Sequence, residues 1–149
     1  MDRTVTEFLR LVALDTDDLK VISACVQDAV ARVGDLEYVP SPGKFIVTMN
    51  RFAWEKESAG QVRIHERRRS VLHFDRVLSV ARTGFDPDQP DTVLSLLAVT
   101  FHPEEDPSGT IELVFAGGAG VRLKVECIEA RLADLGGAWA TEYKPSHPE

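Results

Sequence analysis

The chain has 149 residues, of which 44% are hydrophobic and 28% charged, and its formal net charge at pH 7 is −7. This length and composition predict a single domain over residues 1–149 that buries a core without disulfides or metal ions. The negative charge argues against a general affinity for nucleic acid, and no apolar run approaches the roughly 18 residues that span a bilayer.

The first residues and the cysteines indicate in which cellular compartment the protein is expected. The segment MDRTVTEFLRLVALDTDD lacks the basic start and long apolar run of a signal peptide. Cys25 and Cys127 are the two cysteines, and they show no CxxC spacing. Isolated thiols of this kind are typical of buried, reduced cysteines, so we expect a cytoplasmic protein.

The N-terminal third predicts a strand followed by a helix. Residues 8–14 alternate loosely as a first strand, and Asp15 or Thr16 then provides a helix N-cap. Leu19, Ile22 and Val26 lie at helical spacing. The helix has two alternative ends, near Gln27 or at Gly34. We favour the shorter helix, because 29–39 then forms a strand that pairs through the turn PSPG with the strand KFIVTMNRFAW.

The middle of the chain predicts one long amphipathic strand. In RRRSVLHFDRVLSVAR, which begins at Arg67, the even positions 72, 74, 78 and 80 are apolar, whereas most of the odd positions are polar. Arg76 interrupts the apolar face and indicates a bulge or corner near Asp75.

The C-terminal half predicts three more strands and a helix. VLSLLAVTF is apolar on nearly both faces, as in a central strand, and TIELVF and VRLKVEC alternate cleanly on either side of a glycine-rich turn. CIEARLADLGG places Ile128, Leu132 and Leu135 at helical spacing before Gly136. We expect order over about residues 8–140 and a flexible tail over 144–149.

The predicted fold class is α+β. It consists mainly of antiparallel β structure, with six or seven strands in a curved sheet or partly open barrel, one N-terminal helix and one C-terminal helix. This succession resembles a pleckstrin-homology-like architecture, an analogy of fold that carries no function with it.

Several segments carry a resemblance to a known family. DTDDLKVISA, NRFAWE, RRRSVLHFDRVLSV and VECIEARLADLGGAWAT, taken in order, resemble a family of small alphaproteobacterial proteins catalogued as domain of unknown function 2948. The resemblance extends from about Leu11 to Pro148. It implies a single-domain cytoplasmic bacterial protein, and it brings no activity, cofactor or catalytic residue with it.

The chain carries a positive segment within its acidic whole. Residues 51–82 hold eight basic and four acidic residues, and RIHERRRSVLHFDRV alone holds five arginines and two histidines. On a strand, Arg67, Arg69 and His73 project from one face. Arg63 and Arg51 join them from the neighbouring strand if Gly60 lies near the tip of the hairpin. These five residues are the candidate ligand-binding site for an anion. The alternative is a solvated edge whose arginines are neutralised by nearby acids.

Catalytic and metal sites have weaker support in the sequence. His73 and Asp75 share a strand face, which would orient an imidazole, but no nucleophile is placed by sequence to complete a mechanism. The four histidines are scattered without metal-ligand spacing, and the AGGAG segment lacks the lysine and hydroxyl of a phosphate-binding loop. We therefore assign no catalytic, metal-binding or cofactor-binding residue.

The sequence leaves three functions open. We favour a non-catalytic cytoplasmic binding or regulatory module that recognises an anionic ligand or partner protein through the arginine-rich strand. The first alternative is a small enzyme or ligand-handling protein for a phosphorylated or carboxylated substrate. The second is a structural subunit of a homo-oligomer, in which Trp139 after the terminal helix forms the contact between copies.

Overall fold

The computed structural model describes residues 8–56 and 62–136, and for 54–56 and 62–66 it describes the backbone alone. The strands are β1 (Arg10–Ala13), β2 (Val30–Arg32), β3 (Leu36–Val39), β4 (Lys44–Lys56), β5 (Val62–Phe74), β6 (Val77–Thr83), β7 (Val93–Pro103), β8 (Gly109–Phe115), β9 (Gly120–Val125) and β10 (Ala130–Asp134). The helices are α1 (Thr16–Cys25) and two 3-10 turns, η1 (Val33–Asp35) and η2 (Ala116–Gly118).

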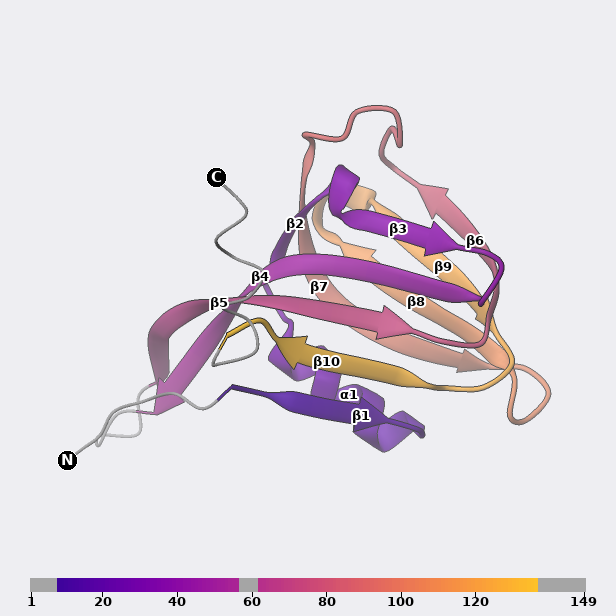
Figure 1. Cartoon of the computed structure of the whole chain (residues 1–149), viewed down its shortest axis with the longest axis horizontal. Helices are drawn as coiled ribbons and strands as arrows, with labels where there is room; N and C mark the ends of the chain where they lie inside the picture. The colour runs from indigo at the N-terminus through magenta and orange to yellow at the C-terminus, as the bar shows by residue number, and fades with distance from the viewer. Residues whose placement is uncertain (1–7, 57–61, 137–149) are drawn as a thin grey trace.

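The strands form one continuous path that folds into two layers. Their order is β1-β10-β5-β4-β2-β7-β8-β9-β6, with β3 added to β4, and each pair is antiparallel. In Figure 1 the strands β3, β4, β5, β10 and β1 lie toward the viewer, and β6 to β9 lie behind them. The short β2 joins the layers, since it pairs with both β4 and β7.

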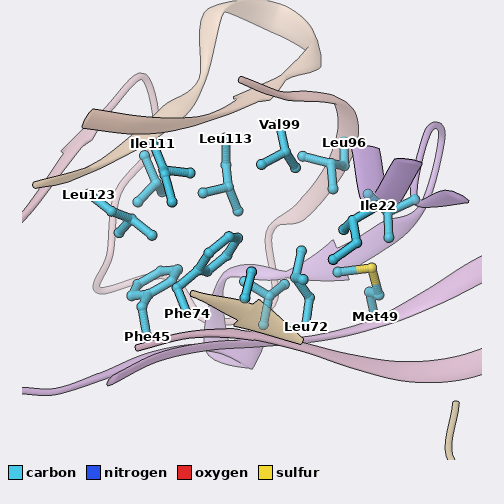
Figure 2. Close-up of a cluster of buried hydrophobic side chains, with 14 of the residues drawn as sticks. Ile22, Phe45, Met49, Leu72, Phe74, Leu96, Val99, Ile111, Leu113 and Leu123 are labelled. Carbon is cyan, nitrogen blue, oxygen red and sulfur yellow. The ribbon is translucent and has the colours of Figure 1, made fainter. Parts of the chain in front are cut away.

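The hydrophobic core fills the space between the layers. Phe45, Leu72 and Phe74 of the front layer face Ile111 and Leu113 of the rear layer (Figure 2), and each is fully or almost fully buried. Alternation along each strand produces this arrangement, because every second side chain points to the same face. The burial of the even residues Leu72 and Phe74 confirms the inward face predicted for this part of β5.

The helix α1 begins where the sequence predicts. Asp15 is the N-cap, and its Oδ1 accepts a hydrogen bond from the Asp18 N–H at 2.8 Å. The helix ends at Cys25, which confirms the shorter of the two alternatives. Its buried residues are Leu19 and Ile22, and Ile22 lies at one end of the core (Figure 2). Among the described residues, no helix is both long and apolar enough to cross a membrane.

The predicted irregularity near Asp75 is confirmed as a corner. Strand β5 ends at Phe74 and β6 begins at Val77, and Arg76 between them has a φ of 61°. The chain thereby passes from the front layer to the rear one, where β6 pairs with β9. The corner changes the alternation, so that Val77 is buried and Leu78, predicted to face inward, is 57% exposed.

The turn between β3 and β4 holds this corner in place. Gly43 has a φ of +67°, and its carbonyl accepts a hydrogen bond of 2.9 Å from the Val77 N–H. A Cβ at Gly43 would lie 2.9 Å from the Val77 carbonyl oxygen, so glycine meets both the conformational and the steric requirement.

Three parts of the predicted fold class are wrong. The described residues form ten strands rather than six or seven, because the segment predicted as one strand over 29–39 forms β2 and β3, the long predicted strand forms β5 and β6, and the predicted C-terminal helix is β10. The predicted C-terminal helix is the strand β10, in which Ala130, Leu132 and Asp134 are buried in alternation. With α1 as the one α-helix of the described residues, the α+β class and the pleckstrin-homology-like architecture are not supported.

Candidate functional site

The face of the front layer that points away from the core carries most of the predicted site. Arg67 and Arg69 of β5 are exposed on it, followed by the partly buried Val71 and His73. Arg131 of β10 lies directly opposite His73 and is also exposed. We call Arg67, Arg69 and Arg131, with the strand surface between them, the outer arginine face.

Aromatic and polar neighbours on β4 position the two arginines of β5. The Arg67 guanidinium carbon lies 5.8 Å from the centre of the Phe52 ring, in the register position directly opposite. Arg69 Nη1 donates a hydrogen bond of 3.1 Å to Asn50 Oδ1, and Arg69 Nη2 lies 3.8 Å from Asp35 Oδ1. Arg69 is thus partly neutralised, whereas Arg67 forms no ion pair with a described residue.

His73 lies in a cluster of opposite charges at the end of this face. Its Nε2 is 3.6 Å from Asp75 Oδ2, and Asp75 also contacts Lys44 Nζ at 3.0 Å and Arg131 Nη1 at 3.4 Å. Burial and the charges of Lys44 and Arg131 lower the pKa of His73 below 6.5, and the carboxylates of Asp75 and Glu129 offset this only in part. At neutral pH the imidazole is therefore mainly uncharged.

The lowered pKa of His73 predicts a pH dependence of stability. The folded state binds this proton less readily than the unfolded state, so the histidine's contribution to stability is complete above pH 6.5 and decreases as the pH falls below it. We expect urea midpoints measured between about pH 7.5 and pH 5.5 to fall less steeply for His73→Gln than for the wild type. Parallel curves for the two proteins would contradict the lowered pKa.

Arg51 lies on the opposite face of β4 from the one that the predicted site requires. It pairs across the sheet with Arg68, whose neighbour Ser70 points inward. Arg51 is 4% exposed, and it donates hydrogen bonds through Nε and Nη2 to the two carboxylate oxygens of Asp134, at 2.8 and 2.7 Å. The structure therefore brings Arg67, Arg69 and His73 together on the outer face and places Arg51 inside.

Asp134 is the centre of this buried network. Its oxygens also accept hydrogen bonds from Ser70 Oγ at 2.6 Å and from the Leu9 N–H at 2.9 Å. Burial alone would raise the pKa of Asp134, but the hydrogen bonds from Arg51, Leu9 and Ser70, with the charge of Arg51, hold that pKa below 3.8. The pair therefore remains ionised across the neutral range, and its network joins β4, β5 and β10 to Leu9, the residue before β1.

For Arg63 the structure describes the backbone alone, and Trp139 lies outside the described residues. Arg63 lies on β5 opposite Glu55, beyond a register shift at Ala53 and Trp54, and its side chain is not among those described. Trp139 and the predicted tail 144–149 lie outside the described residues. The segment expected to form a helix before Trp139 is β10, and the interface at Trp139 stays a prediction.

Two residues of functional interest escaped the sequence analysis. Arg131 reaches the outer arginine face only because β10 pairs with β5, and the sequence was interpreted as a helix there. Asp134 was missed for the same reason. The alternation Phe45, Val47, Met49, Arg51 was nevertheless visible in the sequence, and it assigns Arg51 to the buried face.

The described residues form no metal-binding cluster. Within 8–56 and 62–136, no three His, Cys, Asp or Glu side chains cluster closely enough to hold a metal ion. Ser70, one of the hydroxyl groups near His73 in sequence, is buried on the other face and donates to Asp134. The half-buried thiols of Cys25 and Cys127 are free, and Cys25 lines a hollow beside α1 that contains none of Arg67, Arg69 and His73.

Comparison with known proteins places the chain in a family without adding a function. No curated protein and no solved structure matches it. The family model described as protein of unknown function (DUF2948) matches residues 9–147. This match covers almost the whole chain, including every strand and the helix described above, and the chain therefore belongs to the DUF2948 family.

Proposed function

We propose that the protein is a non-catalytic cytoplasmic module that binds an acidic segment of a partner protein on the outer arginine face. The single observation that carries the proposal is the state of Arg67. Its guanidinium group is exposed, lies over the Phe52 ring, and forms no ion pair with a described residue. A positioned cation without an ion pair among the described residues favours a carboxylate from outside.

The surroundings of Arg67 favour a protein segment over a small anion. Partly buried apolar side chains, Val71 of β5 and Ile46 of β4, lie on the same face as the arginines. Such a surface offers apolar contact between charged groups, as the centres of protein interfaces do. The net charge of −7 over the whole chain disfavours nucleic acid as the partner.

Binding to a synthetic acidic peptide tests this proposal. The probe is a short soluble peptide rich in glutamate with interspersed leucine, titrated calorimetrically at about 50 mM and about 300 mM salt. We expect Arg67→Ala/Arg69→Ala to weaken its affinity by at least about tenfold, or about 1.4 kcal/mol. Wild-type binding should also weaken at the higher salt concentration, because exposed charges are screened.

A matched variant on the rear layer provides the control. Arg82 of β6 and Arg122 of β9 are exposed arginines outside the outer arginine face. Arg82→Ala/Arg122→Ala removes the same total charge and should leave the peptide affinity within about twofold of wild type. An equal loss in the two double variants, or no binding of the peptide at low salt, would contradict the proposal.

A further inference from the structure

A second candidate site lies beside α1, and it shares Phe52 with the surroundings of Arg67. An open hollow of about 560 Å³ is formed there by Val21, Ala24 and Cys25 of α1, Leu9 before β1, and Phe52 of β4. This volume falls within the range of roughly 300–1,000 Å³ that is usual for small-molecule sites. The surface formed by these side chains is mainly apolar, so it suits the hydrocarbon part of a ligand.

Arg51 supplies a polar group in this apolar surrounding. It also lines the hollow, although its side chain is only 5% exposed. A guanidinium group has five N–H donors, and Arg51 uses those of Nε and Nη2 toward Asp134. Within the described part of the chain, Nη1 has no hydrogen-bond partner. Arg51 lines the hollow, so Nη1 remains available as a donor to a ligand that carries an acceptor oxygen.

The charges around the hollow indicate how much negative charge the ligand carries. Asp134 neutralises Arg51 through the bidentate pair. Lys20 of α1 is the remaining charged residue that lines the hollow, and it is exposed. The neutral Arg51–Asp134 pair and the charged Lys20 together provide one net positive charge, and Arg51 Nη1 provides one free donor position. This combination matches a single carboxylate.

We infer that this hollow binds an aliphatic monocarboxylate, with its chain against Val21, Ala24 and Phe52 and its carboxylate toward Arg51 Nη1 and Lys20. The inference does not depend on the proposed partner of the outer arginine face. A failure of either proposal leaves the other intact, because the probe and the variants differ.

The thiol of Cys25 gives a direct readout of occupancy. In a Cys127→Ser protein, we would measure the rate at which a maleimide alkylates Cys25 at one fixed pH, since burial raises the pKa of this thiol. Decanoate is the probe, and decanol of the same chain length is the neutral comparison. We expect saturating decanoate to slow the alkylation at least fivefold, and decanol to need about a tenfold higher concentration for the same effect.

Two variants separate binding in the hollow from unspecific effects. Val21→Glu places a negative charge at an exposed position of the hollow and should abolish protection by decanoate. Val93→Glu makes the same change at an exposed position of β7 and should leave the protection intact. Protection equal for decanoate and decanol, no protection at all, or equal loss in both variants would overturn the inference. Circular dichroism confirms that each variant is folded.

Discussion

Replacing Asp134 with asparagine is expected to lower the free energy of unfolding by about 3–5 kcal/mol, because it leaves the buried Arg51 guanidinium without its counter-charge. The carboxylate has no exposed surface and accepts hydrogen bonds from Arg51, Ser70 and the Leu9 N–H. An amide retains one acceptor oxygen but cannot neutralise the arginine. Urea denaturation at pH 7 measures the effect.

Two comparisons identify the cause of that loss. Asp91→Asn removes an aspartate whose side chain is 95% exposed and lies 4.0 Å from Arg32, and it should change stability by less than about 0.5 kcal/mol. Arg51→Met/Asp134→Leu removes both charges, and it should cost less than Asp134→Asn alone, since no unpaired charge remains. A double variant less stable than Asp134→Asn would contradict this explanation.

The contribution of the Arg51–Asp134 pair to stability is expected to depend on pH in acidic solution. Because the pKa of Asp134 in the folded protein lies below 3.8, its contribution to stability is complete above that pH and is lost as the pH falls through the folded-state value. Asp134→Asn lacks this group, so the difference in stability between wild type and variant should shrink in strongly acidic solution.

Truncating Phe45 to alanine is expected to cost about 3–5 kcal/mol. The ring has no exposed surface and lies beside Phe74, facing the side chains of the rear layer (Figure 2). Its removal leaves a cavity where the two layers meet. Phe45→Leu retains most of the apolar volume and should cost clearly less, below about 3 kcal/mol. Equal urea midpoints for wild type and Phe45→Ala would show that the layers do not pack as described.

The position of several long strands was accessible from the sequence, because alternation over long segments is a strong signal. The register of β4 and β5 places Phe45 opposite Phe74 and Val47 opposite Leu72, and all four side chains are buried as their spacing predicts. The N-cap at Asp15 follows from local hydrogen bonding alone. Information of this kind resides in neighbouring residues, so it requires no knowledge of the fold.

The prediction of a C-terminal helix was wrong because the segment CIEARLADLGG fits both the helical and the strand periodicity. Ile128, Leu132 and Leu135 fit a helix, whereas Ala130, Leu132 and Asp134 fit a strand with one polar position. Pairing with β5 on one side and β1 on the other decides in favour of the strand, and both partners are distant in sequence. Local spacing cannot contain that information.

In the candidate site, too, some residues were predictable from local alternation and others depend on strands that are distant in sequence. Alternation along β5 correctly groups Arg67, Arg69 and His73 on one face, as their burial relative to Leu72 and Phe74 shows. The position of Arg51 could have been taken from the apolar residues that precede it on β4. The burial of its charge, however, depends on Asp134, which approaches only because β10 joins the sheet.

The most direct test of the proposed function locates the acidic peptide on the protein by backbone amide chemical shifts. We predict that titration with the glutamate-rich peptide shifts the amide signals of β4, β5 and β10 around Asn50, Arg69, Val71 and Arg131. Signals of β8 and β9 in the rear layer should remain unchanged. Shifts confined to the rear layer or to α1, with none around Arg69, would contradict the outer arginine face as the binding surface.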